Sequence, residues 1–163
     1  MSKTGFRLEQ MDICIEDACD IASFWWKMKK HNLVDRVFFN GGMKDAAGLF
    51  MLWKSCWVYM GYQDDKMVGA IWFNRFATHA CNIHICSFPG YIADSAHDEI
   101  ESLLQRVLDN STNSAYRILG ETPYKGIVRQ YKQFGFKDAG YCYENTEDAV
   151  ADRNRRYIAV RYK

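Results

Sequence analysis

The hydrophobic positions of this chain recur with two different spacings, and these predict a mixture of helices and strands. Apolar residues return every three or four positions in two long stretches, which predict amphipathic helices. The first stretch comprises Ala18, Ile21, Ala22, Trp25 and Met28. The second comprises Ile100, Leu103, Leu104, Val107 and Leu108. Ser95, followed three residues later by Asp98, has the spacing of a capping box at the start of the second helix.

Runs rich in β-branched and aromatic residues, bounded by polar or glycine-containing segments, predict strands. These strands cover residues 6–12, 57–62, 67–75, 80–88, 115–121, 136–143 and 157–162, and two further helices are predicted over 44–54 and 124–134. The polar turn 63–66 joins two strands in a hairpin, whereas a helix follows each of the strands 80–88 and 115–121. Such crossovers make neighbouring strands parallel.

The sequence therefore predicts a single α/β (α+β) domain over residues 1–163, in which helices flank a central mixed β-sheet. The predicted order of elements is β-α-α-β-β-β-α-β-α-β-β. No internal repeat, linker or low-complexity stretch divides the chain.

One segment carries a resemblance to a known superfamily. Residues 131–136, Tyr-Lys-Gln-Phe-Gly-Phe, resemble the Y-x-x-x-G-F signature of the GNAT (Gcn5-related N-acyltransferase) proteins, where a helix ends and the next strand begins. Gly135 suits the left-handed residue that closes a helix, and Phe136 then enters the core. The element order is also that of GNAT proteins, and the resemblance covers residues 57–143 well.

The resemblance implies an N-acyltransferase that moves an acyl group from acetyl-CoA or another acyl-CoA to an amine of a small molecule or a protein. Tyr131 would protonate the departing CoA thiolate, and its alternative role is to pack on the inner face of its helix. His84 or Glu121 would take a proton from the acceptor amine. Otherwise His84 is a hydrogen-bonded core or rim residue and Glu121 a solvated turn residue.

The implied cofactor-binding residues are Cys86, Ser87, Phe88, Gly90 and Ser95. The pantetheine arm would bind the backbone of strand 80–88 where this strand splays away from strand 115–121. The pyrophosphate would lie at the start of the following helix.

The segment at that helix start departs from the family's Q/R-x-x-G-x-G/A pattern. Residues 88–97 contain one glycine and no arginine or glutamine. Acidic residues stand within this segment, at Asp94, and directly after it, at Asp98 and Glu99. Carboxylates repel a pyrophosphate. The alternative function is therefore a non-catalytic GNAT-like module for binding or assembly, similar to short GNAT-like chains in tailed-phage genomes.

The charge balance argues against nucleic acid and membrane as partners. The 21 basic and 20 acidic residues leave a net charge of +1, and Arg153, Arg155 and Arg156 are interpreted as a solvated turn. No signal peptide or membrane span is predicted, which favours a cytoplasmic protein with six free cysteines. A homodimer remains open.

Two groups of residues with possible chemistry are interpreted as structural. Strand alternation places His79 and Cys81 on one face, and His84 and Cys86 on the other, so no metal site is predicted. The tryptophans are assigned mainly to the core, with a minority lining an acceptor pocket; they are Trp25, Trp26, Trp53, Trp57 and Trp72.

Overall fold

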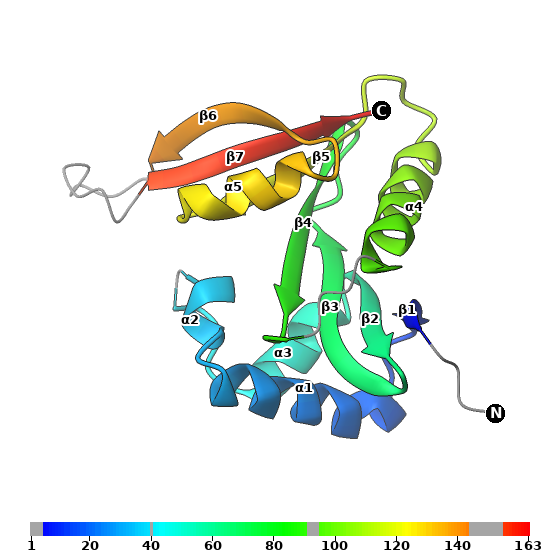
Figure 1. Cartoon of the computed structure of the whole chain (residues 1–163), viewed down its shortest axis with the longest axis vertical. Helices are drawn as coiled ribbons and strands as arrows, with labels where there is room; N and C mark the ends of the chain where they lie inside the picture. Colours follow the sequence, from blue (N-terminus) through cyan, green and yellow to red (C-terminus); the bar gives the residue numbers. More distant parts are fainter. Residues whose placement is uncertain (1–4, 40, 91–94, 144–154) are drawn as a thin grey trace. The chain divides into compact units, whose positions relative to one another are not determined.

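The computed structural model describes residues 5–39, 41–90, 95–143 and 155–163. Seven strands form one mixed sheet in the order β1-β2-β3-β4-β5-β7-β6 (Figure 1). The strands are β1 (Phe6–Met11), β2 (Trp57–Gln63), β3 (Lys66–Asn74), β4 (Ala80–Ser87), β5 (Arg117–Thr122), β6 (Lys137–Tyr143) and β7 (Arg155–Tyr162). The helices are the 3-10 helix η1 (Ile15–Asp17), α1 (Ala18–Lys30), α2 (Val34–Val37), α3 (Ala46–Trp53), α4 (Ser95–Asp109) and α5 (Lys125–Lys132).

This architecture confirms the predicted fold class and nearly all of the predicted elements. The helices η1 and α2 have no predicted counterpart, because segments of three and four residues are too short to show a helical period. The described residues divide by their contacts into two compact units that share β4 and α4. Unit 1 comprises residues 1–74 and 84–99, and unit 2 comprises residues 75–83 and 100–163.

In unit 1, β1, β2 and β3 form an antiparallel meander. The predicted hairpin between β2 and β3 is confirmed, and Gln63 pairs with Lys66 across a two-residue turn. Both turn residues have positive φ, 48° at Asp64 and 62° at Asp65. A type I′ turn requires this conformation, and its twist matches that of the two strands.

The core of unit 1 is built from aromatic rings. Phe24 of α1 contacts the rings of Trp53 and Phe88, with centroids 5.2 Å away in each case. Trp53 in turn packs on Trp72 at 5.6 Å. Trp25 is buried as well. The prediction that these tryptophans form the core is therefore confirmed for three of the five.

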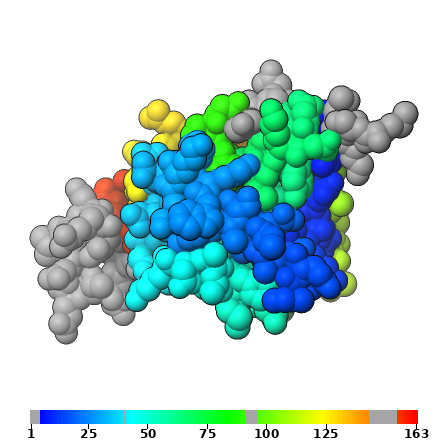
Figure 2. All heavy atoms as spheres, turned by 90° about the horizontal axis from the view of Figure 1, so that it is seen from below, coloured from blue at the N-terminus to red at the C-terminus, as the bar shows by residue number. Residues whose placement is uncertain are grey.

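The core assignment is wrong for Trp26 and Trp57, which are 64% and 36% exposed. One residue along a helix turns the side chain by about 100°, so Trp26 points away from the core that Trp25 enters. Trp57 is the first residue of β2. Figure 2 shows the outer face of unit 1 that α1 and α3 form.

In unit 2, β4 pairs with β5 in parallel, which confirms the crossover prediction. β7 then lies antiparallel between β5 and β6, and α5 contacts all three of these strands. Strand β7 begins at Arg155, two residues earlier than predicted. Arg156 pairs with Cys142 and is buried, so the solvated-turn interpretation is wrong for this residue.

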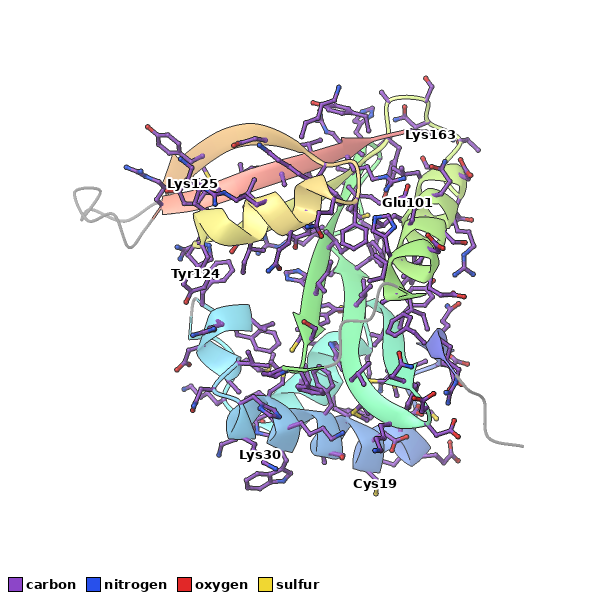
Figure 3. The ribbon with its side chains drawn as sticks, in the orientation of Figure 1. Cys19, Lys30, Glu101, Tyr124, Lys125 and Lys163 are labelled. Carbon is purple, nitrogen blue, oxygen red and sulfur yellow. The ribbon has the colours of Figure 1, made fainter. Side chains whose placement is uncertain are left out.

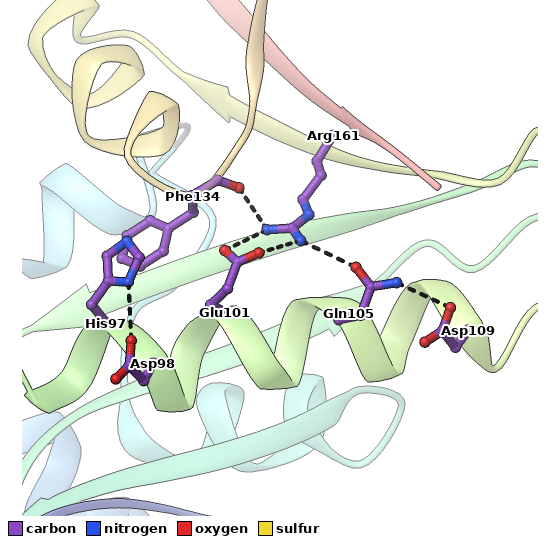
Figure 4. A network of polar contacts seen from close by, with 7 residues as sticks. All are labelled: His97, Asp98, Glu101, Gln105, Asp109, Phe134 and Arg161. Atoms are coloured by element: carbon purple, nitrogen blue, oxygen red, sulfur yellow. Dashed lines mark hydrogen bonds and ion pairs between the residues drawn. The ribbon is translucent and has the colours of Figure 1, made fainter.

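Arg161 of β7 links three elements of unit 2 (Figure 4). Its guanidinium donates two hydrogen bonds to the carboxylate of Glu101 on α4, at 2.6 and 2.7 Å. It donates a third to the carbonyl oxygen of Phe134, just after α5, at 2.7 Å. Arg161 is only 7% exposed, so these acceptors replace the water that its charge has lost.

Replacing Glu101 with glutamine should lower the free energy of unfolding by about 1–3 kcal/mol, because one ionic partner of a buried guanidinium is lost. Chemical denaturation with a fluorescence readout measures this change. Glu99→Gln, at an exposed position of the same helix, is the matched control and should change stability by less than about 0.5 kcal/mol. Equal stability of the two variants would show that the contact has no stabilising role.

Candidate active site

Tyr131 lies on the inner face of α5, and this face also buries Val128. The helix ends at Lys132, two residues before the predicted end at 134, and the glycine that closes it is the predicted one. Gly135 has φ +73°, and the amide of Phe136 donates to the carbonyl of Tyr131 at 3.3 Å. This is the hydrogen-bond pattern of a Schellman motif. The turn brings the Phe136 ring back against Tyr131, with centroids 5.0 Å apart.

The ring of Tyr131 lies directly against the backbone of Gly120 on β5. A Cβ atom at position 120 would be 2.7 Å from Cζ of Tyr131 and 2.9–3.0 Å from its two Cε atoms. Cζ carries the hydroxyl, so Gly120 contacts the polar end of the ring. Glycine in the interior of a strand often marks such a close approach.

The contact between Tyr131 and Gly120 lies where the parallel ladder stops. The ladder between β4 and β5 runs from the pair Ala80–Arg117 to the pair Ile83–Gly120. Strand β4 continues to Ser87, and these last residues lie outside the ladder with β5. The hydroxyl end of Tyr131 therefore contacts the final paired residue of β5.

The environment of the Tyr131 hydroxyl keeps its proton in place. Burial raises the pKa of Tyr131 far above the usual value for a phenol. The residue is 6% exposed, and among the described residues its hydroxyl makes no hydrogen bond. The phenol is thus neutral at physiological pH and retains its capacity to donate a hydrogen bond or a proton.

His84 belongs to unit 1, where two residues of β3 hold its ring. The imidazole is nearly coplanar with the indole of Trp72, at 11° and a centroid distance of 5.3 Å. Its Nε2 lies 3.1 Å from Oδ1 of Asn74. His84 is half-buried, which is the condition of a rim residue and also of a base that reaches a ligand.

Glu121 belongs to unit 2 and is not brought together with Tyr131. Side chains alternate along β5, so Glu121 lies on the face opposite to Gly120. Its carboxylate is 3.7 Å from a guanidinium nitrogen of Arg75 and is about one-third exposed. This arrangement resembles a solvated ion pair more than the setting of a catalytic base.

The predicted cofactor-binding residues lie in different environments. The side chains of Cys86 and Phe88 are buried in the unit 1 core, so a ligand would meet only their backbone. Ser87 and Gly90 are exposed, and Gly90 has φ +87°. Helix α4 begins at Ser95, as predicted, whereas the Ser95 side chain and residue 94 lie outside the described part of the structure.

The end of β4 is held close to β3. A Cβ atom at Gly69 would overlap the carbonyl oxygen of Cys86 and come within 3.1 Å of the Cα atom of Ser87. The amide of Phe88 donates to the carbonyl of Val68 at 2.8 Å. A side chain at position 69 would therefore push away the backbone segment that the resemblance assigns to pantetheine.

The histidines and cysteines of this region have separate partners. His79 contacts the amide of Asn113 through Nδ1 at 2.6 Å, and Cys81 and Cys86 are buried thiols. Burial raises the pKa of Cys81 to about 11 and that of Cys86 to about 12. Within the described residues, no group of three or more His, Cys, Asp or Glu side chains could hold a metal ion.

All six cysteines are free, as predicted, and their exposure varies widely. Cys19 is exposed on the outer side of α1 (Figure 3), and Cys14 and Cys142 are exposed as well. None of the described helices is both long enough and apolar enough to cross a membrane.

The sequence analysis missed three residues that shape this region. Gly120 could have been found, because a glycine inside a predicted strand signals close packing. Asn74 and Trp72 could not, since their contact with His84 depends on the register between β3 and β4, which alternation alone does not determine.

The fold is that of the GNAT acetyltransferases. The GNAT-family acetyltransferase from Bacillus anthracis matches with a TM-score of 0.68 at 15% identity, over 99% of this chain and 97% of that chain. Spermidine N-acetyltransferase from Vibrio cholerae, solved with CoA and spermine, matches with a TM-score of 0.68 at 13% identity, over 96% and 95%. The ribosomal L7/L12 α-N-protein acetyltransferase in complex with coenzyme A matches with a TM-score of 0.70 at 10% identity, over 99% and 96%. No protein-family model and no curated protein matches the sequence.

Gly120→Ala should displace the Tyr131 ring, because the added methyl group would overlap its hydroxyl-bearing carbon. Overpacking of this kind costs about 1–3 kcal/mol of stability. The variant should remain folded with an altered near-ultraviolet tyrosine signal and a lower melting temperature. Gly126→Ala, at a position where a Cβ meets no atom within 4 Å, is the matched control; it should leave the tyrosine signal unchanged and should not lower the melting temperature, because alanine favours a helix more than glycine. An unchanged tyrosine signal in Gly120→Ala would contradict the described packing.

Proposed function

We propose that this protein is an acyl-CoA-dependent N-acyltransferase in which Tyr131 is the general acid. The observation that carries the proposal is the position of a neutral tyrosine against Gly120, at the last residue pair of the parallel ladder. Beyond that pair, the backbone of β4 no longer shares hydrogen bonds with β5, so a ligand can use its polar groups as an additional strand would. The end of β4 supports a place for the pantetheine arm, and Tyr131 supports a proton donor.

The reaction would join the acceptor nitrogen to the acyl carbon and release CoA. The amine first loses a proton and then attacks the thioester carbonyl; a C–N bond forms and the C–S bond breaks. The leaving sulfur takes its proton from the Tyr131 hydroxyl, which regains one from water. General acid catalysis of this kind typically contributes ~10²–10⁴-fold.

Of the two predicted bases, His84 suits the proposed reaction better than Glu121. The imidazole is held by aromatic stacking and a hydrogen bond, and it keeps a nitrogen lone pair as a neutral base. Glu121 is already engaged by Arg75, and it lies on the face of β5 opposite to Tyr131.

One observation favours the second candidate function, a non-catalytic binding or assembly module. The described first turn of α4 carries the acidic residue Asp98, and Glu99 follows it; both side chains are exposed. A pyrophosphate at this helix start would gain from the helix dipole and lose from the two carboxylates. Binding of acyl-CoA therefore decides between the two functions.

Tyr131→Phe should lower the rate of acyl transfer ~10²-fold or more and leave acyl-CoA affinity nearly unchanged, because the ring still packs on Gly120. The rate is followed by thiol release from acetyl-CoA with a panel of amines, and affinity by calorimetric titration. Tyr116→Phe is the matched control, since Tyr116 is also a buried tyrosine of unit 2 and should leave the rate unchanged. Neither heat nor a melting shift with millimolar acetyl-CoA, propionyl-CoA or longer acyl-CoAs would exclude the enzyme and favour the binding module.

Replacing Asp98 with asparagine and Glu99 with glutamine together should tighten acetyl-CoA binding several-fold at low ionic strength. Removal of two exposed carboxylates reduces repulsion of the phosphates, and added salt should diminish the gain because it screens these charges. Acetyl N-acetylcysteamine, a thioester without phosphates, serves as the matched ligand, and its affinity should not change. An equal gain for both ligands would show that the carboxylates do not act on the phosphates.

A further inference from the structure

We infer that the outer face of α1 is the interface through which two copies of this chain pair in antiparallel orientation, with a twofold axis at Ser23. The inference is independent of the proposed enzymatic function. The inner face of α1 is buried in the core of unit 1. Four exposed residues, spaced four, three and four positions apart, form a stripe along the outer face: Cys19, Ser23, Trp26 and Lys30. Cys19 and Lys30 mark the two ends of this stripe in Figure 3.

Large apolar side chains are exposed on this stripe and beside it. Trp26 is 64% exposed. Ile15, just before α1, is 76% exposed, and Met51 of the neighbouring helix α3 is 65% exposed. Figure 2 views the face of unit 1 that α1 and α3 form. Tryptophan and methionine are enriched at protein interfaces, and burial of Trp26 against a partner would remove a large apolar surface from water.

The charges along η1 and α1 indicate which partner fits this face. All acidic residues lie at the start of this segment and all basic residues lie in its last turn; they are Glu16, Asp17 and Asp20, and Lys27, Lys29 and Lys30. A partner with charge of one sign would meet like charges at one end of the helix. A second copy in antiparallel orientation meets opposite charges at both ends, whereas a parallel copy would meet like charges.

The positions of these charges set the register of the pair. Glu16 is seven residues before Ser23 and Lys30 is seven residues after it. Asp17 and Lys29 are each six residues from Ser23. A twofold axis at Ser23 therefore places Glu16 opposite Lys30 and also Asp17 opposite Lys29. Because the interface is symmetric, each of these pairs occurs twice.

The residues near the axis suit a close helix pair. Ser23 is exposed and has a small side chain, so two helices can approach each other there. In this register Trp26 of one copy lies opposite Asp20 of the other, and the indole N–H can donate to that carboxylate. Nζ of Lys29 lies 5.0 Å from the centroid of the Trp26 ring, and this cation–π contact favours the outward orientation of the indole.

The first experiment exchanges the charges of the Glu16–Lys30 pair and measures the dimer dissociation constant by sedimentation velocity. Glu16→Lys and Lys30→Glu should each raise this constant about 10-fold, because like charges then meet twice, and the double variant should recover the wild-type value. Trp26→Ala should raise it about 10-fold or more. Tyr124→Ala, at a 43% exposed position of unit 2, is the matched control and should leave it unchanged. A wild type that is monomeric even at millimolar concentration would overturn the inference, as would a dimer that none of the α1 variants weakens.

The second experiment tests the register at protein concentrations above the measured dissociation constant. Serine first replaces the exposed cysteines Cys14, Cys19 and Cys142. Ser23→Cys in this background should form a disulfide-linked dimer on mild oxidation, because two Cα atoms at the axis lie within the roughly 7 Å that a disulfide spans.

The matched control retains Cys19 and Ser23 and replaces only Cys14 and Cys142. The two Cys19 residues would be eight positions apart along the paired helices, which is about 12 Å, so they should remain thiols. Efficient crosslinking through Cys19, or none through position 23, would overturn the inferred pairing.

Discussion

The buried guanidinium of Arg161 is the interaction on which the geometry of unit 2 depends. A cation that is 7% exposed needs acceptors in fixed places, and here they are the Glu101 carboxylate and the Phe134 carbonyl. Both bonds are charge-assisted, so movement of α4 or of the end of α5 would leave an uncompensated charge. The carbonyl of Phe134 is three residues from Tyr131, and Arg161 thereby fixes the end of the helix that carries the candidate acid.

The contact of Tyr131 with Gly120 fixes the hydroxyl end of the Tyr131 side chain. Arg161 holds the backbone after α5, and Phe136 contacts the Tyr131 ring. The backbone of Gly120 sets how closely this ring approaches β5. Packing alone would be satisfied by phenylalanine. The hydroxyl adds a polar group that ring packing does not require, and burial of the side chain keeps it protonated.

The sequence predicted the fold well because the fold follows from local signals. The stripe from Ile100 to Leu108, the alternating strands and the helix-closing Gly135 each report a period or a backbone conformation. The prediction of buried side chains was wrong where burial depended on which face of a helix a residue occupies. Trp25 and Trp26 are the same residue type, yet Trp26 is exposed to solvent because it lies one position further along α1.

The candidate site was predicted only in part, because it depends on packing between elements. Tyr131 could be identified from its motif. Its ring is placed by contact with Gly120, which lies eleven residues earlier on β5. His84 could be selected by residue type, but its orientation comes from Trp72 and Asn74 across a strand pair. In the sequence, Glu121 was as good a candidate base as His84. Its position on β5, on the face opposite to Gly120, is what directs it away from Tyr131.

The acidic start of α4 and the candidate acid and base act on different parts of the substrate, so they need not conflict. Contacts with the phosphates are the same before and during the reaction, and such uniform binding changes KM without changing kcat. Tyr131 and His84 would act on the sulfur and nitrogen atoms whose bonding changes, and these contacts govern kcat. Exposed carboxylates at Asp98 and Glu99 therefore argue for weak acyl-CoA binding more directly than against catalysis. Weak binding of this kind would make the proposed enzyme depend on a high acyl-CoA concentration.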